Sequence, residues 1–161
     1  MKAVYVKAPY QFELWEIPVP APQSTQILVE VMACAVCGSD LHTAATDAKS
    51  FQSFGHEIAG IARQCGSGGK NKKGDNVVLE SGSFCHTCDN CRNGRVDLCT
   101  CAHSFMDQPD CGGFAEYITV EEQCAVPFTN LSFSVAALAE PLGVALDLFY
   151  TAMGSDILLF P

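Results

Sequence analysis

The chain has 161 residues, of which 48% are hydrophobic and 17% charged, so it can bury a sizeable core and is not disordered. Nine Lys and Arg residues against 18 Asp and Glu give a net charge of −9, which opposes binding to nucleic acid or to an anionic membrane surface. The most apolar run, 135–150, is interrupted by Glu140, Pro141 and Asp147, which excludes a membrane span. Ten cysteines and no N-terminal secretion signal favour a reducing, cytoplasmic compartment and metal chemistry over disulfides.

Alternating apolar residues predict a mainly β chain with few helices. Strands are expected at 3–6 and 12–17, joined as a hairpin, then at 26–35, 58–65, 76–80 and 114–120, with extended chain at 124–127. Ser39-Asp40 predicts the cap of a short helix running toward residue 45. A second helical pattern starts at Ser132 or Ser134, is interrupted at Glu140-Pro141 and resumes to residue 152. Residues 157–160 predict an apolar strand of the kind buried inside a parallel sheet.

Four cysteines with the spacing C-x2-C-x2-C-x7-C give the strongest local signal in the chain: Cys85, Cys88, Cys91 and Cys99. Four thiolates close the tetrahedral shell of zinc at about 2.3 Å and leave no position for a substrate. Disulfides or free thiols are the alternative, but bridged Cα atoms lie about 4.4–6.8 Å apart in defined orientations, and three cysteines within seven residues do not pair easily. The spacing therefore predicts a structural zinc site.

A looser set of residues has the chemistry of a catalytic zinc site: Cys37, His56, Glu57 and Glu140. Such a site needs three protein ligands and one open position, and mixed thiolate, imidazole and carboxylate ligands suit it. Adjacent side chains normally diverge, so His56 and Glu57 need a bend in the chain to reach one ion. Cys37 as a small buried hydrophobe, His56 as a core histidine and Glu57 as a carboxylate orienting His56 remain open alternatives.

Several motifs in order resemble those of zinc-dependent medium-chain alcohol and polyol dehydrogenases. They are C-G-S-D-L-H from Cys37, G-H-E-I-A-G from Gly55, G-D-N-V from Gly74, the four-cysteine segment, G-G-F-A-E-Y from Gly112 and E-P-L from Glu140. The last motif, with Gly154-Ser155 before an apolar run, looks most like the sorbitol, xylitol and arabinitol dehydrogenases. The resemblance covers essentially the whole chain.

The resemblance implies a GroES-like, partly open β-barrel with a zinc-binding lobe and a C-terminal helical stretch. It implies that Cys37, His56 and Glu57 bind the catalytic zinc, with Glu140 reaching it directly or through water, and that Ser39 and His42 relay a proton to solvent. It also implies two zinc ions and NAD or NADP: zinc acidifies a bound alcohol, and hydride passes to the nicotinamide. The implied substrate is a small secondary alcohol or polyol.

The resemblance also implies a domain division. Residues 1–150 are expected to form the GroES-like catalytic domain, with the structural zinc lobe at 84–103, and 151–161 the truncated start of a Rossmann cofactor domain. Pro161 stands where the glycine-rich turn of that domain would begin. A non-enzymatic zinc-binding remnant, or an interaction protein, is therefore the alternative to a dehydrogenase. An exposed apolar strand at 157–160 predicts self-association.

Overall fold

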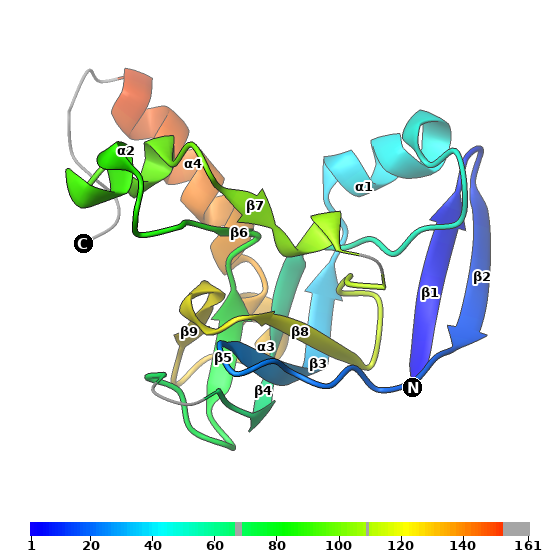
Figure 1. The fold of residues 1–161 in the computed structure, drawn as a ribbon. Coiled ribbons are helices and arrows are strands. Elements are labelled where there is room, and N and C mark those ends of the chain that lie inside the picture. Colours follow the sequence, from blue (N-terminus) through cyan, green and yellow to red (C-terminus); the bar gives the residue numbers. More distant parts are fainter. Residues whose placement is uncertain (67–68, 109, 153–161) are drawn as a thin grey trace.

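A five-stranded antiparallel sheet forms the body of the molecule (Figure 1). The structure, a computed structural model, describes residues 1–66, 69–108 and 110–152. Strand order in the sheet is β8-β3-β4-β5-β9. These strands are β3 (Gln26–Ala35), β4 (Glu57–Gln64), β5 (Asn76–Leu79), β8 (Tyr117–Glu121) and β9 (Ala125–Pro127). The predicted mainly β fold is confirmed.

The sheet curls around one apolar cluster, which explains the alternating pattern of the sequence. Ile27 and Val29 of β3 are fully buried in it, together with Ile118 and Val120 of the neighbouring β8. Residues two apart in a strand face the same side, so each strand presents one apolar face to this core. A smaller cluster on another part of the sheet is built from alanines, with Ala59 packed against the buried Ala136 and Ala137.

A β-hairpin of β1 (Lys2–Lys7) and β2 (Gln11–Glu16) lies beside the sheet, as predicted. Two isolated β-bridges are among the contacts that join β1 to the rest of the chain, one from Ala3 to Ala115 and the other from Val6 to Gln52. The segment before β8 therefore pairs with β1, and this shortens the strand expected at 114–120. The result is the partly open, GroES-like barrel that the motifs imply.

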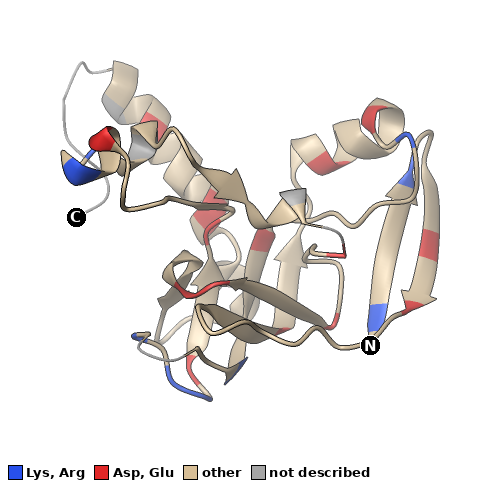
Figure 2. Ribbon diagram, in the orientation of Figure 1, with Lys and Arg blue, Asp and Glu red and all other residues tan. Residues whose placement is uncertain are grey.

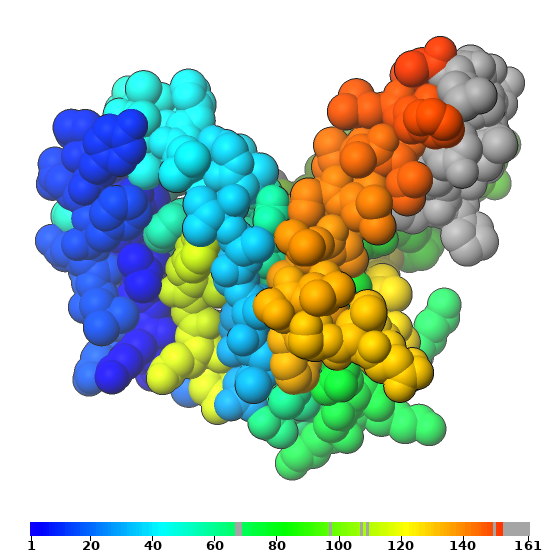
Figure 3. Space-filling view, turned by 180° about the vertical axis from the view of Figure 1, so that it is seen from behind, coloured from blue at the N-terminus to red at the C-terminus, as the bar shows by residue number. Residues whose placement is uncertain are grey.

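Short helices and one small ribbon connect the strands. They are α1 (Gly38–His42), a π-helical turn (Thr43–Asp47), β6 (Gly82–Ser83), α2 (Asp89–Arg92), three 3-10 turns (Val96–Leu98, Phe105–Asp107, Glu122–Cys124), β7 (His103–Ser104), α3 (Phe133–Ala136) and α4 (Ala139–Ala152). Seen from behind, a hollow separates the α1 segment from α4 (Figure 3). The two helices therefore form opposite walls of one open space.

Two details of the helices differ from the prediction. The residue that caps α1 is Cys37, not Ser39, because the Cys37 amide donates to the Asp40 carboxylate at 2.9 Å. Ser132, one of the two expected helix starts, caps α3. The interruption of the helical stretch, expected at Glu140-Pro141, falls instead between α3 and α4, before Glu140. Pro141 is the third residue of α4, where its missing N–H costs nothing because the first four amides of a helix have no intrahelical partner.

Lys, Arg, Asp and Glu residues are distributed over many elements of the ribbon and are not confined to one segment (Figure 2). No helix within the described residues is long and apolar enough to cross a membrane. The strand predicted at 157–160 lies outside the described residues, so the start of a cofactor domain is not tested.

At Gly60 of β4, the backbone of the neighbouring strand β3 lies very close. A Cβ at Gly60 would lie 2.2 Å from the Glu30 carbonyl oxygen, whereas a Cβ at Gly82 of β6 would meet nothing within 4 Å. We predict that Gly60→Ala lowers the free energy of unfolding by about 1–3 kcal/mol, the usual cost of overpacking. Denaturant unfolding measures the loss, and Gly82→Ala is the matched control. Equal stability of the two variants would contradict this description of the sheet.

Candidate metal centres

The four cysteines of the C-x2-C-x2-C-x7-C segment come together in a loop beside the barrel. Their sulfur atoms are 3.6 Å apart between Cys85 and Cys99, and 4.0 Å apart in the pairs Cys85–Cys91 and Cys88–Cys99. A tetrahedron with Zn–S bonds of about 2.3 Å has S–S edges of about 3.8 Å. The spacing of the thiols therefore fits a tetrahedral metal ion, and it is too wide for a disulfide.

Local hydrogen bonds favour the thiolate form at two of these cysteines, Cys85 and Cys88. Hydrogen bonds from the Thr87 side chain and from the Thr87 and Cys88 amides lower the pKa of the Cys85 thiol to about 5. The pKa of Cys88 falls to about 7, chiefly because the Cys91 amide donates to its sulfur. Desolvation and the adjacent thiols raise the pKa of Cys91 to about 12. A dication among the four sulfurs supplies the charge that ionises such a thiol.

The loop is attached to the barrel through one glutamine. The Gln123 amide nitrogen donates to the Phe84 carbonyl at 2.9 Å, and its Oε1 lies 2.5 Å from His86 Nε2. Gln123 belongs to the 3-10 turn that connects β8 to β9 of the main sheet. Its contacts with Phe84 and His86 therefore attach the lobe to the sheet on both sides of Cys85. The helical turn α2 then carries Cys91, and Gly94, with a φ of 78°, turns the chain back toward Cys99.

The second candidate metal centre consists of Cys37, His56 and Glu57. One ligand atom of each lies within 4.8 Å of the others, and His56 and Glu57 are only 7% and 6% exposed. The bend that two adjacent ligands require lies at Gly55, whose φ of 90° is open to glycine and rarely to other residues. Three converging protein donors of this kind match a catalytic zinc site, which keeps a fourth position open.

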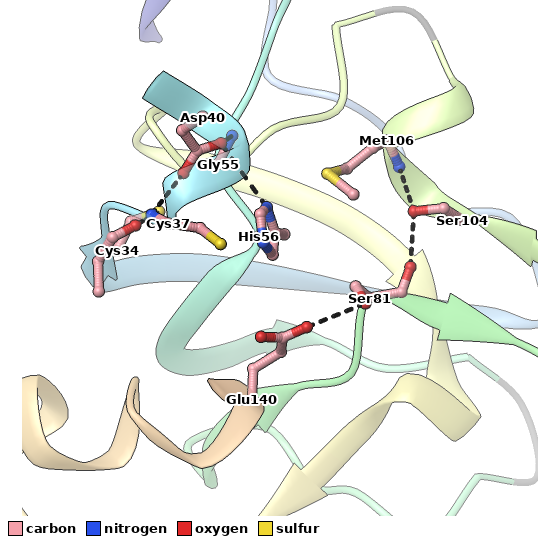
Figure 4. Close-up of polar contacts among 10 residues, drawn as sticks. Cys34, Cys37, Asp40, Gly55, His56, Ser81, Ser104, Met106 and Glu140 are labelled. Carbon is pink, nitrogen blue, oxygen red and sulfur yellow. Dashed lines mark hydrogen bonds and ion pairs between the residues drawn. The ribbon is translucent and has the colours of Figure 1, made fainter. Parts of the chain in front are cut away.

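Asp40 is a buried carboxylate that joins the two halves of this centre (Figure 4). Its Oδ2 accepts the Cys37 amide at 2.9 Å, and its Oδ1 accepts the Gly55 amide at 3.2 Å. The same Oδ1 lies 3.6 Å from His56 Nδ1, a buried atom without a closer hydrogen-bond partner. Because Nδ1 faces Asp40, Nε2 is left for a metal, the arrangement by which a carboxylate orients a ligating histidine.

Asp40 is the functional residue that sequence reasoning missed, since Asp40 was expected only to help cap the helix. A signal was available, because an acidic residue three positions after a helix cap commonly accepts the cap's own amide. The orientation of His56 by a carboxylate, offered above as a role for Glu57, falls to Asp40. Glu57 instead lies among the three converging donors.

Cys34 is a second thiol near this centre, but its chemistry differs from that of Cys37. Burial, followed by the nearby carboxylates of Asp40 and Glu57, raises the pKa of Cys34 to about 12. It therefore stays protonated near neutral pH, and it is not one of the three converging donors. Its sulfur fills space beside two glycines: a Cβ at Gly113 would lie 2.6 Å from it, and one at Gly55 3.0 Å.

The two residues expected to relay a proton lie on α1 and are exposed to solvent. Ser39 and His42 are three positions apart, the spacing that places side chains on one side of a helix. His42 Nε2 lies 3.5 Å from the Asp47 carboxylate and 3.5 Å from the Thr46 hydroxyl. Asp47 and Thr46 are both polar and exposed. A proton that passed from Ser39 to His42 would therefore reach solvent at His42.

Glu140, the fourth expected ligand, is not brought into this group. It is in the first turn of α4 and half-buried, and its Oε1 accepts the Ser81 hydroxyl at 3.3 Å. Figure 4 shows its carboxylate directed at Ser81, in the region below His56. Of the four residues proposed for the catalytic zinc, the structure thus gathers three.

Comparison with known proteins shows the family. Residues 23–130 match the alcohol dehydrogenase GroES-like domain, and the chain belongs to that family. It is 33% identical to a sorbitol dehydrogenase of Bacillus subtilis (strain 168) over 91% of the chain and 44% of the relative. An L-threonine 3-dehydrogenase of Pyrococcus furiosus is 35% identical over 88% of the chain and 42% of the relative. The chain thus spans less than half the length of these curated relatives.

Solved structures agree with the fold. Galactitol-1-phosphate dehydrogenase from Escherichia coli superposes with a TM-score of 0.85 at 28% identity, covering 95% of this chain and 45% of that one. Relatives named for sorbitol and for L-threonine match at similar identity, so the narrower polyol branch stays a prediction.

We predict that the purified chain binds two zinc ions and that Cys99→Ser reduces the content to one. The lost ion is that of the lobe, because three thiolates no longer close its coordination shell. Cys101→Ser is the matched control, since Cys101 is an exposed neighbour outside the group. Elemental analysis gives the zinc per chain. A Cys99→Ser protein that still holds two ions would rule out the four-thiolate site.

We further predict that Asp40→Ala weakens zinc binding at the Cys37 centre by about 10–100-fold, the usual cost of losing a residue that orients a metal ligand. Asp47→Ala, which removes an exposed carboxylate nearby, is expected to leave that affinity unchanged. Competition with a chromophoric chelator measures both. If the two variants bind zinc equally, Asp40 has no positioning role.

Proposed function

We propose that the chain is the catalytic half of a zinc-dependent oxidoreductase that oxidises a small secondary alcohol or polyol, with NAD or NADP as hydride acceptor. The observation that carries this proposal is the convergence of one thiol, one imidazole and one carboxylate, with Asp40 behind the imidazole. A closed structural site uses four protein ligands, whereas this centre offers three. Family membership agrees with the proposal.

The proposed roles follow from the geometry. Cys37, His56 and Glu57 would hold the metal. Asp40 positions Cys37 by accepting its backbone amide, and it positions His56 by facing its imidazole ring. When bound, zinc supplies Lewis-acid chemistry that acidifies the substrate hydroxyl. Ser39 accepts that proton while its own hydroxyl proton passes to His42, whose ring lies exposed beside Asp47.

The domain division belongs to this proposal. We assign residues 1–150 to the catalytic domain, with 84–103 as its zinc lobe, and 151–161 to the start of a cofactor domain. The length of the relatives supports this, since each is more than twice as long as the part matched here. Self-association through 157–160 lies outside the described residues and stays a prediction. A cytoplasmic location is supported by the ten cysteines, all of which are free thiols.

The activity test uses the zinc-loaded chain with NAD or NADP and a panel of secondary alcohols, polyols and L-threonine, monitored by the absorbance of the reduced nicotinamide. Ser39→Ala is expected to lower the rate by about 100-fold or more, the contribution of a positioned proton-transfer group. Ser39→Thr keeps a hydroxyl and is expected to retain most of the activity. Cys37→Ser is expected to abolish it.

Two results would argue against this proposal. A chain that holds two zinc ions and reduces no nicotinamide supports the alternative, a zinc-binding protein without enzymatic activity of its own. Activity that survives Cys37→Ser would show that the reaction does not use this centre. Cys101→Ser controls for unspecific effects of removing a thiol.

A further inference from the structure

Glu140 is a carboxylate whose position raises a question that its sequence motif does not answer. It begins α4, on the wall of the hollow opposite α1 (Figure 3). A metal held by three donors would have a fourth position, and a carboxylate such as Glu140 has the chemistry to occupy it. The Glu140 side chain is bound elsewhere, to the Ser81 hydroxyl at 3.3 Å. The hydrogen bond between Ser81 and Glu140 therefore affects whether a metal at this centre has three or four protein ligands.

Within the part of the chain that the structure describes, no cationic side chain pairs with Glu140. The ion pairs among the described residues join His42 to Asp47, His56 to Asp40 and Arg63 to Glu30, and none includes Glu140. The first turn of a helix gives partial compensation through its free amides. A half-buried carboxylate held only by a neutral hydroxyl is a group that a nearby dication can attract, since oppositely charged groups interact strongly away from bulk water.

Ser81 is itself fixed, so its hydroxyl is a defined partner rather than an incidental one. The Ser81 carbonyl accepts the Ser104 hydroxyl at 2.7 Å, and the Ser104 oxygen accepts the Met106 amide at 3.2 Å. Figure 4 shows this chain of contacts running from Glu140 through Ser81 to Ser104 and Met106. It ties the start of α4 to the β6–β7 ribbon and the turn that follows it.

We propose that Ser81 is a positioning residue that holds Glu140 away from the three-ligand centre and so keeps the fourth ligand position open to a substrate oxygen. This rests on the proposed function, because it presumes a metal at Cys37, His56 and Glu57. The Ser81 hydroxyl retains Glu140 through its hydrogen bond. When that bond is lost, the Glu140 carboxylate competes with the substrate oxygen for the open metal position.

The size of the effect follows from the bond. A hydrogen bond to a charged group contributes enough free energy that losing one at the weak end of the range shifts an equilibrium by about tenfold. Ser81→Ala is therefore expected to raise the share of molecules with Glu140 on the metal by about that factor. An external ligand then binds the open position correspondingly less well.

The test uses the cobalt-substituted 161-residue chain titrated with azide, a small anion that binds an open metal position and changes the visible spectrum of cobalt. The Ser81→Ala chain is expected to bind azide about tenfold more weakly than the parent. Ser81→Thr, which keeps the hydroxyl, is expected to match the parent. The double variant Ser81→Ala with Glu140→Gln is expected to recover the parent affinity, because the amide no longer competes as an anion.

Equal azide affinity of Ser81→Ala and the parent overturns the proposal, as does a double variant that stays weak. Cobalt bound to the four-thiolate lobe gives its own bands, and these report whether each variant is folded. Should Ser81→Ala lose those bands, the single variant Glu140→Gln decides the matter: affinity equal to or above the parent's supports the proposal, and weaker binding overturns it.

Failure of the proposed function looks different. In that case the parent shows no azide-dependent change beyond that of Cys37→Ser, because no open metal position exists at that centre. A parent that binds azide through Cys37 and a Ser81→Ala variant that binds it equally well leave the metal centre standing and remove only the role of Ser81.

Discussion

The buried Asp40 carboxylate is the contact on which the three-donor centre depends. Cys37 and His56 come from segments separated by α1 and the π-helical turn. Pairing of β3 with β4, which places Ala35 opposite Glu57, brings these segments together, and the Asp40 carboxylate then accepts the Cys37 and Gly55 amides and faces the His56 ring. A carboxylate 5% exposed is costly to bury unless it is hydrogen-bonded, so the two amide hydrogen bonds also explain why its burial is tolerated.

The two candidate centres differ in how the chain builds them. The four-thiolate lobe lies within fifteen consecutive residues, with its own turns and amide donors, and it meets the sheet through Gln123. The other centre takes its donors from the start of α1 and the start of β4, two places that only the folded barrel brings together. One centre can form locally, whereas the other is a product of the whole domain.

This difference decides how much the sequence could predict. The strands were found from alternation, to within a few residues at their ends, and the cysteine spacing was enough for the lobe. Ligand chemistry is enough to name Cys37, His56 and Glu57 as candidates, but it leaves their alternative roles open, because spacing does not show which distant donors converge. The sequence predicts an interruption of the last helix at Glu140-Pro141, whereas Pro141 stands in the first turn of α4, where proline is tolerated. The contacts of Asp40 with His56 and of Ser81 with Glu140 depend on side-chain positions, which periodicity does not report.

Cys34, Gly55 and Gly113 share one small volume beside the metal ligands. A methyl group on Gly113 would lie 2.5 Å from Ile58 Cγ1 and 2.6 Å from the Cys34 sulfur, and one on Gly55 would lie 2.6 Å from the Phe114 ring and 3.0 Å from the same sulfur. Changes at Gly113 and Cys34 are therefore coupled rather than additive. Gly55 is restricted in addition by its φ of 90°, so more space at Cys34 alone would not free it to vary.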